Sequence, residues 1–222
     1  MPKKPRIVLL HATPVAVAPV ETSFANRWPD AELVNLLDDS LSADRARTRE
    51  LTPEMVDRFL ELGRYANRLG ADGILVTCSA FGPAIEQMAR DLPIPVLKPN
   101  EAMFRAALAT GSKIGMLATF APSVLTMTEE FDEFVQAAEA DATLRTVVAD
   151  GAMDALRSGD AETHNSRVAA CAHELDDCDA IMLAHFSTSR AMSLVKSVVQ
   201  IPVLAAPDAA VDQLKGRILG PA

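Results

Sequence analysis

Two residues whose side chains can carry protons follow short apolar segments, and they lie 107 residues apart. Cys78 follows Gly73–Thr77, and His185 follows Ala180–Ala184. A thiol just before a helix has a lowered pKa, because the helix dipole and the free N–H groups favour the thiolate. Imidazole is the usual general acid or base near neutral pH. Either residue alone is also common in a structural core, but their matching positions favour a catalytic pair.

The spacing of this pair reflects an internal repeat. Residues 72–102 align with residues 179–209 without a gap, and each segment contains the tetrapeptide Ile-Pro-Val-Leu. The starts of the two halves also correspond, with Thr13 aligned to Thr119 at an offset of 106. Self-similarity of this length predicts two similar structural units.

Short apolar segments alternate with longer amphipathic ones, as is typical of βαβ units. Strands are expected at residues 7–10, 32–36, 74–77, 96–97, 114–117, 144–148, 181–184 and 203–204. Helices are expected at residues 52–69, 83–90, 102–109, 122–140, 160–176 and 189–199. Thr52 before Pro53 is a start signal for the first of these helices, which is expected to stop at Gly70.

This pattern predicts an α/β fold with two pseudo-symmetric lobes, at residues 1–100 and 101–204. Each lobe is expected to be a mostly parallel sheet flanked by helices, with a C-terminal helix at residues 205–220 packing back on the first lobe. Ligands of open α/β sheets bind at the carboxyl ends of the strands. We therefore expect the active site in the cleft between the two lobes.

Other side chains on the strand-end loops are candidate substrate-binding groups, because hydroxyl and backbone N–H groups there can hold a carboxylate. They are His11, Thr13, Thr77, Ser79 and Ala80 in the first half, and Thr119, Phe120, Ser123, Phe186 and Ser187 in the second. The hydroxyls could equally cap helices. Zinc held by His11, Cys78 and His185 is an alternative, but no zinc-like spacing supports it and no metal is expected. These loops contain no Arg or Lys except Arg190, so recognition of a second carboxylate lacks support.

Composition narrows the classes of function. The 222 residues are 49% hydrophobic and 23% charged, as in ordinary globular proteins. A net charge of -9 and only 5% aromatic residues argue against binding to nucleic acid. No apolar run approaches the roughly 20 residues of a membrane span, and the three cysteines fit a reducing compartment. We expect a cytoplasmic protein, although Ile7–Leu10 between basic and small residues could also belong to a signal peptide.

Two segments resemble a known family. Residues 70–79 resemble the first cysteine loop of the Asp/Glu/hydantoin racemase superfamily, and residues 114–119, continuing to Ser123, are similar to the opening strand of its second lobe. Together with the duplication, the resemblance extends over nearly the whole chain. It implies a cofactor-independent site in which a cysteine from each lobe flanks the substrate α-carbon, and it implies a homo-oligomer. Cys78 matches the first cysteine, whereas His185 stands where the family has the second.

These observations favour an isomerase, namely a racemase or epimerase of a small amino-acid derivative or 2-substituted carboxylate. Cys78 and His185 are expected to exchange the α-proton on opposite faces of the substrate. The family resemblance leaves two alternatives open: an arylmalonate-type decarboxylase in which Cys78 protonates the enediolate, and a maleate-type cis–trans isomerase in which Cys78 adds to the substrate. A two-lobed protein that binds a small ligand without catalysis is the remaining alternative.

Overall fold

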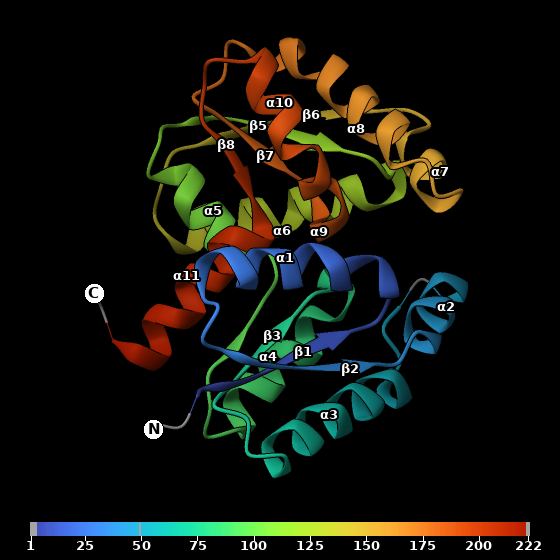
Figure 1. The fold of residues 1–222 in the computed structure, drawn as a ribbon, viewed down its shortest axis with the longest axis vertical. Coiled ribbons are helices and arrows are strands. Elements are labelled where there is room, and N and C mark those ends of the chain that lie inside the picture. Colours follow the sequence, from blue (N-terminus) through green and yellow to red (C-terminus); the bar gives the residue numbers. More distant parts are fainter. Residues whose placement is uncertain (1–3, 49, 221–222) are drawn as a thin grey trace. The chain divides into compact units, whose positions relative to one another are not determined.

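The computed structural model describes residues 4–48 and 50–220 and has an α/β architecture (Figure 1). It contains two four-stranded parallel sheets, with strand orders β2-β1-β3-β4 and β6-β5-β7-β8. The strands are β1 (Arg6–His11), β2 (Glu32–Leu37), β3 (Gly73–Val76), β4 (Val96–Leu97), β5 (Lys113–Ala118), β6 (Thr143–Val148), β7 (Ala180–Leu183) and β8 (Val203–Ala205). Every predicted strand is present, and the predicted α/β fold class with parallel sheets is confirmed.

Helices connect the strands. They are α1 (Val17–Arg27), α2 (Ser40–Arg47), α3 (Pro53–Arg68), α4 (Gly82–Asp91), α5 (Glu101–Leu108), α6 (Val124–Ala137), α7 (Ala152–Arg157), α8 (Ala161–Ala170), α9 (His185–Thr188), α10 (Met192–Val198) and α11 (Ala206–Leu219). Helix α3 begins as predicted, because the Thr52 hydroxyl accepts a hydrogen bond from the Met55 N–H at 3.3 Å. The sequence pattern does not predict helix α1, because Pro19 interrupts its apolar stretch; this proline lies in the first turn, where it is tolerated.

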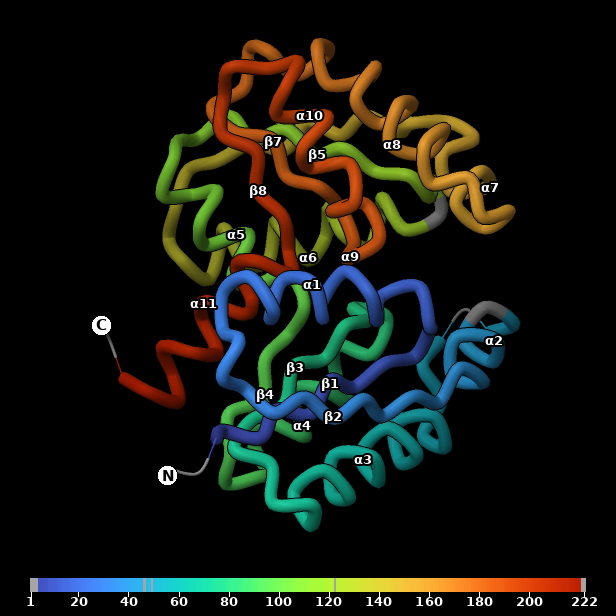
Figure 2. Tube along the Cα trace, viewed as in Figure 1, coloured from blue at the N-terminus to red at the C-terminus, as the bar shows by residue number. Residues whose placement is uncertain are grey.

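The chain divides into two compact units, which are described separately. Unit 1 comprises residues 1–100 and 210–222, and unit 2 comprises residues 101–209. Figure 2 shows the path of the chain through both units. Helix α5 follows β4 of unit 1 but packs against β7 and β8 of unit 2. Helix α11 follows β8 of unit 2, and its Leu214 and Ile218 lie against Gly73 of unit 1, where a Cβ atom would be 2.8 Å from Ile218.

The strand pairing corrects one detail of the predicted repeat. Leu10 pairs with Val76 in unit 1, and Leu117 pairs with Leu183 in unit 2, so the first strands are also offset by 107 residues. Thr119 therefore corresponds to Ala12, and the predicted match between Thr13 and Thr119 is wrong by one residue. The shared Ala-Thr dipeptide suggests the wrong alignment, whereas register in a buried sheet is set by the hydrogen-bonded pairing.

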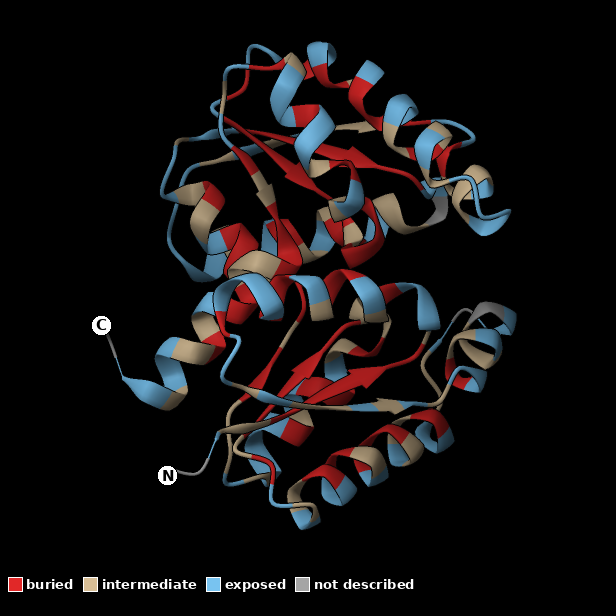
Figure 3. Ribbon diagram, in the orientation of Figure 1, coloured by how far each residue is buried: buried red, intermediate tan, exposed pale blue. Residues whose placement is uncertain are grey.

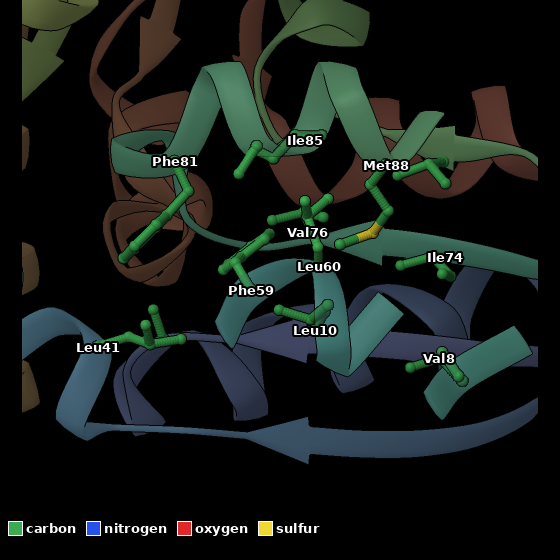
Figure 4. Packing of buried hydrophobic residues seen from close by; sticks show 14 of the residues in the cluster. Val8, Leu10, Leu41, Phe59, Leu60, Ile74, Val76, Phe81, Ile85 and Met88 are labelled. Carbon is green, nitrogen blue, oxygen red and sulfur yellow. The ribbon is translucent and has the colours of Figure 1, made fainter. Parts of the chain in front are cut away.

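Each sheet is packed against helices, and most of its strand residues are buried (Figure 3). In unit 1, a hydrophobic cluster joins the sheet to α3 and α4, and the Phe59 and Phe81 rings stack in it with centroids 4.8 Å apart (Figure 4). In unit 2, a second cluster joins β5 and β7 to α8 and α10. Helices α5 and α6 of unit 2 meet through Phe104 and Phe131, whose rings pack edge to face at 5.4 Å. These cores hold the strand ends, and thus the loops that follow them, in defined positions.

The aspartates that match in the repeat have one structural role. The Asp72 carboxylate accepts a hydrogen bond from the Arg6 N–H at 2.8 Å, and Asp179 accepts one from the Lys113 N–H at 2.8 Å. These N–H groups begin β1 and β5, the strands to which β3 and β7 pair. Backbone hydrogen bonds from Lys113 and Ser112 lower the pKa of Asp179. The duplication has therefore preserved a contact that fixes the start of one interior strand in each sheet.

Candidate active site

In unit 1, the paired strands β1 and β3 bring the predicted polar residues of both loops to the carboxyl end of the sheet. Strand β1 ends at His11, and Thr77 and Cys78 directly follow β3. His11 and Thr77 are buried, whereas Thr13, Cys78, Ser79 and Ala80 are partly exposed. The carboxyl end of this parallel sheet therefore presents a thiol together with hydroxyl and backbone groups, as expected for a ligand site in an α/β fold.

Cys78 has an extended backbone, with φ -131° and ψ 120°, and it precedes a short 3-10 turn at Ser79–Phe81. Burial raises the pKa of its thiol, and the Ala80 N–H and the Arg45 guanidinium only partly oppose this effect. The predicted lowering of the Cys78 pKa is therefore wrong. Helix α4 begins only at Gly82, so its dipole acts weakly on the sulfur, and the cost of burying a thiolate is larger. Cys78 is a thiol at neutral pH and can donate a proton.

In unit 2, the predicted residues follow β5 and β7. Thr119 is buried, and its hydroxyl lies 3.4 Å from that of Thr188 in α9. Phe120 is exposed, and the Ser123 hydroxyl donates a hydrogen bond to its carbonyl at 2.7 Å. A cavity of about 220 Å³ opens at the carboxyl end of this sheet. It is lined by Thr119, Phe120, Ala121, Val148, Asp150, Gly151, Met153, Asp154 and Arg157. Of the other predicted groups, Phe186 and Ser187 are buried within unit 2.

His185 begins α9 with a left-handed backbone, at φ +65°. This conformation is uncommon for residues other than glycine and concentrates at functional sites. Burial lowers the pKa of the imidazole to about 4, and the Ala184 carbonyl offsets only part of this shift. Among the residues that the structure describes, Nδ1 has no hydrogen-bond partner of normal geometry. His185 is therefore neutral at pH 7 and can accept a proton.

Two arginines stand close to these loops and are not among the predicted site residues. The Arg45 guanidinium donates a hydrogen bond to the Ala80 carbonyl at 3.4 Å, next to Cys78. Arg157 lines the unit 2 cavity, with its guanidinium 5.4 Å from the centroid of the Phe120 ring. In the sequence, arginines alternate with acidic residues around Arg45, which predicts a solvated loop or helix face, or else a mobile lid; the sequence contains no signal for Arg157. Tertiary packing thus brings two arginines close to loops whose own sequence contains only one, Arg190.

Neither a metal-binding cluster nor a membrane-spanning helix occurs in the part of the chain that the structure describes. No three or more His, Cys, Asp or Glu side chains form a metal-binding group within residues 4–48 and 50–220. Within those residues, no helix is both long enough and apolar enough to cross a membrane. The other cysteines lie in unit 2, where Cys178 is buried and Cys171 is partly exposed. Burial raises the pKa of both thiols.

Comparisons with known proteins identify the family and the fold. The Asp/Glu/Hydantoin racemase family model matches residues 12–214. The chain belongs to this family. Its fold is similar to that of glutamate racemase RacE1 from Bacillus anthracis, at 17% identity and a TM-score of 0.70, over 97% of this chain and 84% of that one.

Two further racemases share the fold. Allantoin racemase from Klebsiella pneumoniae is 16% identical, with a TM-score of 0.68 over 96% of this chain and 86% of that one. Aspartate racemase from Picrophilus torridus is 16% identical, with a TM-score of 0.71 over 96% and 93%. No protein of curated function matches the chain in sequence. At these identities the similarity establishes the fold, and the chemistry must be argued from the site.

Proposed function

We propose that this family member is a cofactor-independent racemase or epimerase of a small 2-substituted carboxylate, such as an amino-acid derivative. Cys78 and His185 are proposed to act on opposite faces of the substrate α-carbon. The observation that supports this most strongly is their equivalence: each is the second residue after the buried third strand of its repeat, in a chain that belongs to a racemase family. Each also has a side chain that can carry a proton.

The protonation states of the two residues define the direction of the first step. The neutral imidazole of His185 takes the α-proton, and the electron pair of the broken C–H bond passes into the carboxylate to give an enediolate. The Cys78 thiol then gives its proton to the opposite face of the α-carbon. The products are the inverted substrate, a thiolate and an imidazolium, and the reverse reaction begins from this ion pair. Both forms hold the same number of protons, so loss of a proton from the imidazolium to solvent and uptake of one by the thiolate restore the starting state for the next forward turnover.

Charge that develops on the carboxylate oxygens is the main obstacle to removing an α-proton. Preorganised hydrogen-bond donors and cations are the most effective means of stabilising it. Arg45 beside the Cys78 loop and Arg157 in the unit 2 cavity are the cations that we propose for an anionic substrate. The hydroxyls of Ser79 and Thr119 are proposed as additional donors.

Proton exchange in D2O, followed by NMR, tests this proposal. A panel of amino acids, hydantoins and substituted malonates is incubated with the wild type, Cys78→Ala, His185→Ala and the matched control Cys171→Ala. We expect α-deuterium incorporation with inversion in the wild type and the control. Both site variants should lose it by a factor on the order of 10² to 10⁴, the usual contribution of a general acid or base.

The same experiment separates the alternatives. Release of CO2 with deuterium in the product, dependent on Cys78 but not on His185, would identify a decarboxylase. Conversion of a cis to a trans diacid that depends on Cys78 would identify the isomerase that acts by addition. Binding of a panel compound with neither exchange nor turnover would identify a binding protein. Each of these three outcomes excludes the racemase.

The resemblance also leads us to propose a homo-oligomer in the cytoplasm. Light scattering on the purified protein measures the first property, and a single-subunit mass would contradict it. Fractionation of the source cells measures the second, and recovery outside the cytoplasm would contradict it. Neither result affects the assignment of Cys78 and His185.

A further inference from the structure

A chain of polar side chains runs through unit 1 to the residue that precedes Cys78. The Asn35 amide Nδ2 donates to Glu21 Oε1 at 2.7 Å, and Asn35 Oδ1 lies 2.9 Å from His11 Nε2. His11 Nδ1 lies 2.8 Å from the Thr77 hydroxyl. This series of contacts begins at Glu21 of α1, passes through the exposed Asn35 of the edge strand β2, and ends at the buried residues His11 and Thr77.

The partners fix every hydrogen in this chain. A carboxylate accepts hydrogen bonds, so Glu21 turns the NH2 group of Asn35 toward itself and the oxygen toward His11. That oxygen requires a hydrogen on His11 Nε2. Burial lowers the pKa of His11, so the ring is neutral and its Nδ1 is an acceptor. The Thr77 hydroxyl therefore donates to Nδ1 at 2.8 Å, in preference to the Leu10 carbonyl at 3.3 Å.

Unit 2 forms the same kind of sheet without this network of polar side chains. By strand pairing, Ala118 is the counterpart of His11, and Ala184 is the counterpart of Thr77. The backbone contact at this position is kept in both units, since Thr77 N–H donates to the Leu10 carbonyl at 3.0 Å and Ala184 N–H to the Leu117 carbonyl at 2.9 Å. The fold thus does not require the side-chain network. Buried polar groups are costly unless they are paired, so its presence beside Cys78 points to a role in the site.

We propose that His11 is a positioning residue for Cys78, which it orients through the Thr77 hydroxyl. Both ring nitrogens of His11 are engaged by protein groups, so the ring supports the site and does not bind the substrate. Thr77 is held by its main chain and by its side chain, and these two attachments fix the direction in which the backbone leaves β3. That direction in turn sets the orientation of the next side chain, that of Cys78. The inference deepens the proposed function, because it rests on Cys78 as a reacting group.

The first test needs no variant. The imidazole nitrogens of His11 are observed by NMR in the uniformly ¹⁵N-labelled protein at neutral pH. We expect a neutral ring with the proton on Nε2 and an unprotonated, hydrogen-bonded Nδ1. A proton on Nδ1, in either the neutral or the charged ring, would overturn the proposal, because Thr77 could not then donate to that nitrogen.

The second test measures the reactivity of Cys78. Iodoacetamide labels the thiols, and peptide mass spectrometry gives the ratio of the Cys78 rate to the Cys171 rate in the same sample. We expect Thr77→Val and His11→Gln to raise this ratio roughly threefold or more, because the loop opens locally when its anchor is lost. Thr77→Ser keeps the hydroxyl and should keep the ratio of the wild type.

A merely structural role predicts a different result, because the ratio would then follow the free energy of unfolding of each variant, measured by urea titration, and not the presence of the hydroxyl. An unchanged ratio in Thr77→Val would therefore overturn the proposal. Once a substrate is known, His11→Gln should lower kcat about tenfold with little change in KM, as expected for a misplaced reacting group. The thiol measurement involves no substrate, so failure to find racemisation would remove the proposed function and leave the positioning result to stand or fall separately.

Discussion

The loop after β3 and the loop after β7 occupy the same place in two copies of one sheet, yet they are built differently. In unit 1, Cys78 is extended, and the loop ends at Phe81, whose ring stacks on Phe59. In unit 2, His185 adopts φ +65°, and the loop ends at Thr188, whose hydroxyl contacts Thr119. Stacked aromatic rings therefore hold the end of the loop in unit 1, and a contact between two hydroxyls holds it in unit 2; we call these the apolar and the polar anchor.

The comparison shows which parts of a duplicated fold are free to diverge. The two sheets keep the same pairing from β1 and β5 onward, because a slip of one residue would turn every buried side chain to the wrong face. The loops carry no such constraint. They place a neutral thiol in one unit and a neutral imidazole in the other, since burial acts in opposite directions on the pKa of Cys78 and that of His185. Because the two loops are free to differ, one can present a thiol and the other an imidazole, which together form an asymmetric acid–base pair.

The largest effect is expected from making the two loops chemically alike with His185→Cys. The wild type needs a neutral imidazole and a thiol, so the acid limb of kcat/KM should lie at the pKa of His185, about 4, and the alkaline limb at the raised pKa of Cys78. Two thiols need one of them ionised, so the acid limb of the variant moves up to a thiol pKa, which is ordinarily about 8.5 and which burial raises further. At pH 5.5 the variant should have lost on the order of 10³ or more of its own alkaline rate.

The measurement is a pH profile of α-proton exchange for both proteins on the best substrate of the panel. Cys171→Ser removes a thiol from unit 2 outside the site and should keep the wild-type profile. A His185→Cys profile that coincides with that of the wild type would show that residue 185 does not titrate in the reaction. The comparison of the two loops would then carry no chemical meaning.

The next effect concerns the two anchors. Phe81→Ala removes a fully buried ring that stacks on Phe59, and such truncations cost about 3–5 kcal/mol. Thr188→Val removes only a hydroxyl whose contact with Thr119 is long, at 3.4 Å, and should cost about 1 kcal/mol or less. Free energies of unfolding from urea titrations measure both changes. An equal cost for the two variants would mean that the loops are not anchored by these contacts.

Much of this arrangement can be predicted from the sequence. Short apolar runs predict every strand, and the constant offset of 107 residues pairs Cys78 with His185. What cannot be predicted depends on packing. Arg157 reaches the Phe120 ring from α7, which local pattern does not predict, and the direction of the Cys78 pKa follows from how deeply its loop is buried. Helix α1 is not predicted, because it contains Pro19. A proline is tolerated in the first turn of a helix but breaks its interior, and the sequence does not show where this helix begins.

The smallest effect tests the backbone difference between the two loops. At φ +65°, asparagine is tolerated better than alanine, so His185→Asn should be more stable than His185→Ala by about 1 kcal/mol. Cys78, at φ -131°, provides the matched pair: Cys78→Asn should show no such advantage over Cys78→Ala, because the extended backbone suits both residues. Urea titrations of the four variants give the two differences. Equal differences at both positions would mean that the left-handed turn imposes no constraint, and the contrast between the loops would then lie in their side chains alone.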